Sequence, residues 1–165
     1  MRQVLMALVL VAGCGAGSDQ GNGSADKARA GGAVQTSTLT GLYEGGASLR
    51  PHQMCVIDKG AGNASFGLVV WGDNMHSCSG AGEAVREGGT LRLTMTGDES
   101  CAIEAKIDGA NVTLPQTLPE GCSYYCGARA RMGGTSFAKK GGTAEDAMKA
   151  KDLVGEPLCS GLSGG

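Results

Sequence analysis

The side chains best suited to chemistry in this sequence are two histidines, each close to a cysteine. His52 precedes Cys55 by three residues, and His76 precedes Cys78 by two. Two cysteines and two histidines are a common ligand set for zinc, so one hypothesis is a zinc site. The spacing does not match a known zinc-ligand pair, and cysteines of exported proteins usually form disulfides. We therefore favour disulfides here, a Cys55–Cys78 bridge among them, and expect no metal and no cofactor.

His76 is also the histidine with the neighbours that a hydrolase would need. Asp73 could orient its ring, and Ser77 or Ser79 could act as the nucleophile. Neither serine lies in the Gly-x-Ser-x-Gly motif that exposes a nucleophile at a strand-to-helix turn. The sequence also lacks a metalloprotease motif, a phosphate-binding loop and a complete dinucleotide-binding glycine motif. We therefore expect a protein that is not an enzyme, with a hydrolase or metal site around His76 as an alternative.

Three of the few aromatic residues could form a small binding patch. They are Trp71, Tyr124 and Tyr125, and His76 is a candidate polar neighbour. Trp and Tyr suit such a patch because each joins a large apolar ring to a polar group. The alternative is that Trp71 packs in the core and the tyrosines cover disulfides.

The first thirteen residues are typical of a secretory signal peptide. Met1–Gly13 has one cation, Arg2, followed by an apolar run from Val4 to Ala12. This run is shorter than the roughly 20 residues that a membrane-spanning helix needs. A cationic start, a short apolar stretch and small residues at its end predict a leader that is removed.

The end of this leader, Val11-Ala12-Gly13-Cys14, resembles the lipobox of bacterial lipoproteins, in which small residues precede an obligatory cysteine. The resemblance covers only the leader and the first mature residue. It implies that the chain is cut before Cys14, acylated there and anchored in a lipid bilayer of the cell envelope. Gly15, in place of an aspartate, favours the outer membrane over the inner one. Several acyl chains together hold a protein firmly at a membrane.

Composition divides the mature chain into a tether and one domain. Residues 14–40 are rich in Gly, Ser and Ala without apolar periodicity, which indicates a flexible tether with a reach on the order of 28 Å. Residues 41–165 have a normal length for a single domain. With 16 acidic against 14 basic residues, the chain has no excess of positive charge that would attract nucleic acid. The expected partners are the lipid bilayer and an envelope protein.

The seven cysteines leave an even number once Cys14 carries lipid. In an oxidising compartment the other six predict three disulfides, in a pairing that the sequence leaves open. Three residues separate Cys122 from Cys126, whereas a thioredoxin-type redox motif has two, so this pair indicates structural half-cystines around a turn. The six candidates are Cys55, Cys78, Cys101, Cys122, Cys126 and Cys159.

Short apolar segments predict a mainly β domain. Gly41–Glu44 and Gln53–Ile57 are expected to be strands, and His76–Val85 a glycine-rich strand or loop. Ser65–Trp71 is the most apolar segment, with large apolar residues at both alternating sets of positions. Because successive side chains of a strand point to opposite faces, we expect a central strand that is covered on both sides.

The clearest pattern runs from Leu91 to Leu114, where apolar and polar residues alternate. It predicts a three-stranded antiparallel meander with one face in water. Asp108-Gly109 is a strong signal for a two-residue hairpin turn, and residues 98–100 are expected to form the preceding loop. The predicted cross-strand pairs are Ile107–Ala110, Ala105–Val112, Ile103–Leu114, Met95–Ile103 and Leu93–Ala105.

A short helix is expected near the C-terminus. Thr143 is a good N-cap, and acidic residues in the next turn suit the helix dipole. Helical spacing continues to Lys151, and Gly155-Glu156-Pro157 should end the helix.

The sequence therefore predicts a small antiparallel sheet, folded as a sandwich or a partly open barrel, held by disulfides, with one short helix. For function we expect an envelope lipoprotein that acts as a non-catalytic binding or structural module. One alternative is an inhibitor of an envelope-attacking enzyme such as lysozyme, which would present Asp98-Glu99 at a hairpin tip to a basic cleft. That alternative rests on analogy between folds. The second alternative is the hydrolase or metal site around His76.

Overall fold

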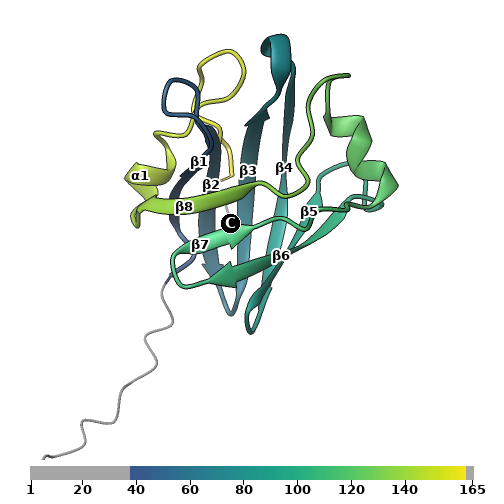
Figure 1. The fold of residues 1–165 in the computed structure, drawn as a ribbon. Helices are drawn as coiled ribbons and strands as arrows, with labels where there is room; N and C mark the ends of the chain where they lie inside the picture. The colour runs from purple at the N-terminus through teal and green to yellow at the C-terminus, as the bar shows by residue number, and fades with distance from the viewer. Residues whose placement is uncertain (1–37, 163–165) are drawn as a thin grey trace, which may run out of the picture. The chain divides into compact units, whose positions relative to one another are not determined.

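The computed structural model describes residues 38–162, which form a closed barrel of antiparallel strands in up-and-down order (Figure 1). Each strand pairs with the next one along the chain, and β8 pairs with β1 to close the ring. The expected mainly β fold is confirmed. The predicted leader, Cys14 and nearly all of the predicted tether lie outside the described residues. The strands are β1 (Gly41–Gly45), β2 (His52–Gly60), β3 (Asn63–Trp71), β4 (Ser77–Glu87), β5 (Thr90–Met95), β6 (Ala102–Asp108), β7 (Asn111–Thr113) and β8 (Ser136–Gly141).

Side chains fill the inside of the barrel. Alternate residues of each strand point inward, and a ring of eight strands is just wide enough for its own side chains to fill it. Phe66, Phe137 and Met54 are fully buried there. The interior is therefore a packed core, and binding has to occur on the outside or at the ends. Other fully buried members are Val56, Leu68, Leu91, Leu93, Ile103 and Ala105.

The prediction that the strand at 65–71 is covered on both faces is confirmed. Its inward residues lie in the core, and its outward residues Ser65 and Val69 are also buried. The segment that follows the helix covers this outer face: a Cβ atom at Gly67 would meet the Leu158 side chain at 2.9 Å. Of the two alternatives left open for residues 76–85, a strand or a loop, the structure has the strand, as β4.

The predicted meander forms as β5, β6 and β7, with one buried and one wet face, but its two hairpins are shifted from the predicted register. In β6–β7, Ile107 pairs with Val112 instead of Ala110, so the turn is Gly109-Ala110. Gly109 has φ +59° and takes the first central position, where a type II′ turn needs glycine, whereas the prediction gave it the second. This shift by two residues keeps every apolar side chain on the predicted face.

The β5–β6 hairpin departs from prediction in the same way. Leu93 pairs with Ile103 instead of Ala105, and Leu91 takes the place opposite Ala105. The ladder ends earlier than predicted because the connection is longer than residues 98–100. The pairing continues as far as Cys101, whose carbonyl accepts a hydrogen bond of 3.1 Å from Met95 N–H, and Cys101 is also bonded to Cys122.

The predicted C-terminal helix is present but shorter. The helix α1 (Ala144–Ala147) begins at a capping box in which Thr143 and Asp146 satisfy each other's backbone N–H groups. The prediction that the helix continues to Lys151 was wrong. The backbone N–H of Lys151 donates to the side chain of Gln53 on β2 at 2.9 Å, which draws the chain away from the helical path. Two short 3-10 helices, η1 (Asp73–Met75) and η2 (Glu120–Tyr125), lie in connections between strands.

All six predicted half-cystines are paired in three disulfides. They join Cys55 to Cys159, Cys78 to Cys126 and Cys101 to Cys122. The suggested Cys55–Cys78 bridge is therefore wrong, because these cysteines belong to different bridges. The first bridge fixes the C-terminal segment to β2, and the other two fix the long β7–β8 connection to the barrel.

The up-and-down order gives the barrel two unlike ends (Figure 1). We call the end at which residues 38–40 lead into β1 the tether end; it also holds the short β2–β3, β4–β5 and β6–β7 turns. We call the opposite end the loop end. It carries the four longer connections, at 46–51, 72–76, 96–101 and 114–135. The loop at 152–156 also lies there, beside the start of β2.

Candidate binding surface

Large apolar side chains that remain exposed gather at the loop end. Six are exposed within residues 38–162, and five of them lie on loops at this end. The sixth, Val85, is on β4 near the tether end and is 37% exposed. We call the five the apolar rim; they are Leu49, Met75, Tyr124, Leu153 and Val154.

The β1–β2 and β3–β4 loops are joined beneath part of this rim. The Arg50 guanidinium lies 4.9 Å from the centre of the Trp71 ring, a cation–π contact, and it also contacts the Met75 sulfur. The backbone N–H of Trp71 donates to His52 Nδ1 at 3.0 Å. Burial lowers the pKa of His52, because it disfavours the charged form of the ring. The neutral ring is the form that can accept this hydrogen bond. Trp71 is thus half-buried and supports the rim.

The β3–β4 connection holds Met75 in an unusual backbone conformation. Asn74 and Met75 have φ values of 51° and 68°, in the left-handed region that residues other than glycine rarely adopt. Hydrogen bonds from His76 N–H to the Asp73 carbonyl and from Gly72 N–H to the His76 carbonyl close the loop around them. Such conformations cluster at binding sites, and here one presents a side chain that is 64% exposed.

The histidine site considered from sequence is not assembled. His76 is half-buried and Asp73 is exposed, and only a backbone hydrogen bond joins them. Within residues 38–162, no hydrogen bond connects the His76 ring to Ser77 or Ser79. The same part of the chain has no group of three or more His, Cys, Asp or Glu side chains placed to hold a metal ion. Cys55 and Cys78, the cysteines of the zinc hypothesis, are taken up by separate disulfides.

The three aromatic residues considered as one patch come from two elements, Trp71 from the end of β3 and the two tyrosines from η2. Tyr124 and Tyr125 pack edge to face on η2, with ring centres 5.5 Å apart. The Tyr125 hydroxyl donates to the Thr96 carbonyl at 3.1 Å, while Tyr124 is 83% exposed. No ring contact in the described part of the chain links either tyrosine to Trp71. The binding patch of these three residues therefore stays a prediction, and Trp71 and Tyr124 both belong to the loop end.

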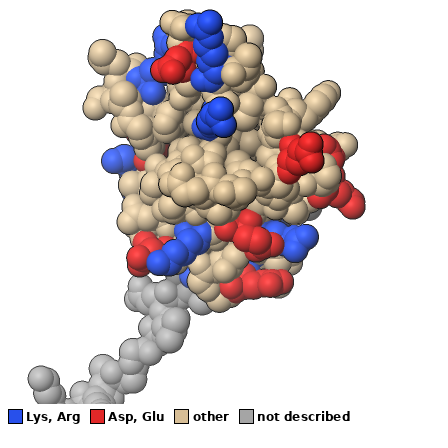
Figure 2. Space-filling view, turned by 45° about the vertical axis from the view of Figure 1, so that its right-hand side comes forward, with Lys and Arg blue, Asp and Glu red and all other residues tan. Residues whose placement is uncertain are grey.

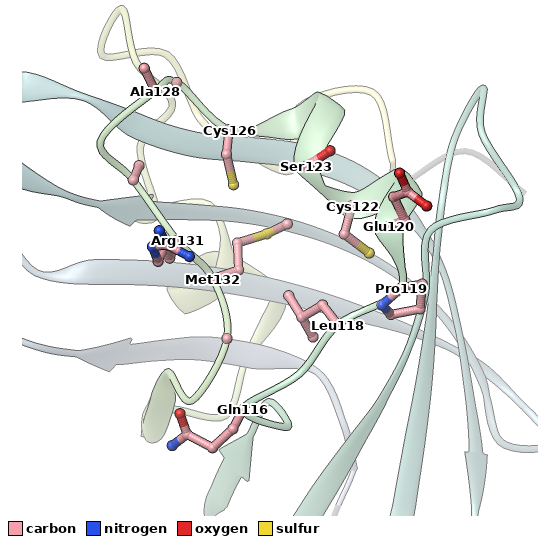
Figure 3. A pocket seen from close by; sticks show the side chains of 13 residues that line it. Gln116, Leu118, Pro119, Glu120, Cys122, Ser123, Cys126, Ala128, Arg131 and Met132 are labelled. Atoms are coloured by element: carbon pink, nitrogen blue, oxygen red, sulfur yellow. The ribbon is translucent and has the colours of Figure 1, made fainter.

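A cavity of about 630 Å³ opens inside the β7–β8 connection (Figure 3). We call it the slot. Leu118 and Met132 point into it from the two legs of the connection, and Met132 is almost fully buried. The Cys122 and Cys126 disulfides hold the far end of the connection to the barrel at two separate points. The slot is thus preformed.

The β5–β6 connection is a rigid loop with an acidic tip. Asp98 accepts hydrogen bonds from the Ser100 hydroxyl and from its backbone N–H, and these lower the pKa of Asp98. The Cys101 disulfide and the Tyr125 hydroxyl fix the loop on both sides. Glu99, between the bonded residues, is exposed. Only Glu99 of the predicted Asp98-Glu99 pair therefore has its carboxylate outside this turn network.

The tether end is partly covered by the chain that leads into β1, beside a cavity of about 300 Å³. Leu39 is buried, and its carbonyl accepts a hydrogen bond of 2.8 Å from the Tyr43 hydroxyl. Lys139 Nζ donates to the Thr38 carbonyl and lies 5.5 Å from the centre of the Tyr43 ring. Burial raises the pKa of Tyr43 to about 12. Residues 38–40 are therefore held against the barrel and cover part of this end.

Charged side chains are unevenly spread over the surface. On the face in Figure 2, acidic side chains gather at one edge and both signs occur at the two ends, while a band across the middle carries no charge. Apolar and uncharged surface is typical of the centre of an interface, where charged residues are depleted.

Sequence reasoning missed most of this surface. Leu49 is a single apolar residue and Leu153-Val154 is an apolar pair, each in a glycine-rich or polar turn and isolated from any periodic pattern. That isolation is the one signal that could have marked them, because a turn residue rarely reaches a core. The slot residues had no such signal, since their proximity depends on the disulfide pairing.

No known protein family, curated protein or solved structure matches this chain. Within residues 38–162, no helix is long and apolar enough to cross a membrane.

Proposed function

We propose that this protein is a lipid-anchored, non-catalytic binding module of the bacterial cell envelope that holds a partner protein at its loop end. One observation carries the proposal: five of the six large exposed apolar side chains in residues 38–162 lie at the loop end. Loops are where binding residues usually occur when a rigid scaffold positions them. The packed barrel is such a scaffold, and its filled interior leaves the ends for recognition.

The residue types of the rim support protein recognition. Met and Tyr are enriched at protein interfaces, and Met adapts its shape to a partner. Burying exposed apolar surface contributes about 25 cal/mol for each Å² removed from water. The supporting loops are held by a cation–π contact and disulfides, which reduces the entropy lost when a partner binds.

The direction of the chain agrees with an anchored binder. A tether from Cys14 would reach the barrel at the end that residues 38–40 partly cover, so the loop end is the one farther from the point of attachment. The part of the expected tether that precedes residues 38–40 would allow the barrel to stand clear of the lipid headgroups.

The anchor has its own test. Cys14→Ser should leave the precursor uncut and abolish incorporation of labelled palmitate in cells. If the variant still incorporates palmitate, Cys14 is not the lipidated residue.

The binding role is tested by affinity capture with the full chain from detergent-solubilised envelopes. A partner retained by the wild type should be lost from Leu49→Ser/Val154→Ser, because both serines remove apolar area from the rim. Val85→Ser is the matched control, since it removes an exposed apolar side chain from the other end. Equal loss from the rim variant and the control, or retention by both, would contradict docking at the loop end.

A second function, inhibition of an envelope-attacking enzyme such as lysozyme, is favoured by the rigid β5–β6 loop. Its disulfide and turn hydrogen bonds hold Glu99 at an exposed tip, as a basic catalytic cleft would require. The full chain should then inhibit lysozyme in a cell-wall lysis assay, and Glu99→Lys should abolish the inhibition. No inhibition by the wild type, or equal inhibition by Glu99→Lys, would rule this function out.

A further inference from the structure

The slot is held open before any ligand arrives. At its base the two legs of the β7–β8 connection are joined by hydrogen bonds from Leu114 N–H to the Thr135 carbonyl and from Gly134 N–H to the Pro115 carbonyl. At its tip, one disulfide leads from Cys122 to the start of β6 and another leads to β4. The legs diverge between these fixed points. A ligand therefore does not have to order this segment, which reduces the entropic cost of binding.

The middle of the slot is apolar. Leu118 and Met132 meet there from opposite legs, with Ala130 and Pro119 beside them (Figure 3). A volume of about 630 Å³ is within the usual size range of sites for small ligands or a few residues of peptide. This part of the slot suits an aliphatic side chain.

Two opposite charges flank this apolar middle. Arg131 and Glu120 are the only charged residues that line the slot, and they lie on opposite sides of it in Figure 3. Both are exposed. No hydrogen bond or ion pair engages the Arg131 side chain within residues 38–162, although a guanidinium can bind a carboxylate with two parallel hydrogen bonds. The Arg131 side chain is thus available to a ligand carboxylate. It lies on the side of the slot away from Glu120, whose own carboxylate would repel such a group.

We propose that the slot binds the C-terminal carboxylate of a peptide chain whose last side chain is apolar. The carboxylate binds Arg131, and the last side chain packs on Leu118 and Pro119, above the buried Met132. This inference rests on the proposed binding function and names the group of the partner that is recognised.

The test uses the full chain in detergent micelles and a fluorescein-labelled pentapeptide that ends in leucine with a free carboxylate. Fluorescence anisotropy should show saturable binding. A C-terminal amide of the same peptide, and a peptide ending in lysine, should each bind about tenfold more weakly or worse, since each lacks one of the two recognised features.

The matched variants are Arg131→Gln and Arg129→Gln. Both remove one exposed arginine from the same leg, but only Arg131 lines the slot. Arg131→Gln should weaken binding of the free acid about tenfold and leave the amide unchanged, whereas Arg129→Gln should bind like the wild type. Equal binding of acid and amide, equal loss in both variants, or no binding of the acid would overturn the proposal.

Failure of this proposal can be told apart from failure of the binding role. Leu49→Ser/Val154→Ser should keep the wild-type affinity for the peptide, because neither residue lines the slot. If the peptide does not bind but the rim variant still loses its captured partner, the carboxylate site is wrong and docking at the loop end stands.

Discussion

At the scale of single residues, adjacent positions of β6 have opposite environments. Ile103 is fully buried in the barrel, while Glu104 is exposed and forms an ion pair of 3.2 Å with Arg92 on β5. This contrast follows because successive side chains of a strand point to opposite faces. The alternation of apolar and polar residues in the sequence predicted it. The shift of the hairpins by two residues does not affect it.

Ile103→Asp should destabilise the protein by roughly 3–5 kcal/mol, because it places an unpaired charge in the barrel core. Glu104→Gln is the control. It should change the free energy of unfolding by less than about 1 kcal/mol, since exposed ion pairs contribute little. Urea unfolding of the full chain, followed by fluorescence of its one tryptophan, measures both. Similar losses at the two positions would be incompatible with an inward-facing Ile103.

The hydrogen bond between His52 and the Trp71 backbone was not predictable from sequence. A histidine near a cysteine pattern suggested metal binding, but burial and a backbone donor set its role here. Nothing local in the sequence indicates this, because the two residues lie on different strands and meet only through the β2–β3 register.

His52 should make stability depend on pH. Its pKa is lowered in the folded state, so the unfolded chain binds the proton first as the pH falls through the ordinary histidine value of 6.5. The contribution of the neutral His52 ring to the free energy of unfolding is present above pH 6.5 and is lost as the pH falls below it. From about pH 8 to about pH 5, unfolding free energy should therefore fall more for the wild type than for His52→Gln. An unchanged pH dependence in His52→Gln would contradict this role.

At the scale of elements, the sequence predicted which segments are strands and which faces they bury, but not their exact pairing. Both hairpins of the meander moved by an even number of residues, because burial penalises only odd shifts. The choice among even shifts depends on turn geometry, such as the placement of Gly109 at the first central position of the β6–β7 turn. It also depends on a disulfide that the spacing of the cysteines does not reveal. The slot was unpredictable for the same reason.

The helix α1 depends on its capping box. Thr143→Ala should cost about 1 kcal/mol and loosen the helix, because the first turn loses a side-chain acceptor. Urea unfolding measures the change. Lys140→Ala, an exposed residue of β8 outside the capping box, is the control and should stay close to the wild type.

The same capping box should respond to acid. Hydrogen bonds from Lys149 and Thr143 lower the pKa of Asp146 to about 2. Because the folded state lowers this pKa, the ionised Asp146 carboxylate stabilises the fold when the pH is above the ordinary carboxyl pKa of 3.8. This stabilisation is lost as the pH falls from 3.8 towards about 2. Asp146→Asn should therefore show a smaller loss of stability over that interval than the wild type. An equal loss would mean that the capping carboxylate does not act in this way.

At the scale of the whole molecule, the barrel is polarised along its axis. One end is partly covered by the residues that lead in from the predicted tether, and the other carries long connections with exposed apolar side chains. Up-and-down order places every second connection at the same end, and in this chain the longer connections share one end. A protein built in this way can be attached at one end and recognise a partner at the other.

The most direct test of this account is photo-cross-linking in living cells. A photoreactive amino acid is placed at Leu49 or at Val85 in the full-length chain, so that the two exposed apolar positions report on opposite ends. We predict that Leu49 gives a discrete cross-linked protein band on illumination and that Val85 does not. A band of equal strength from Val85, or no cross-linked protein from Leu49, would contradict partner binding at the loop end.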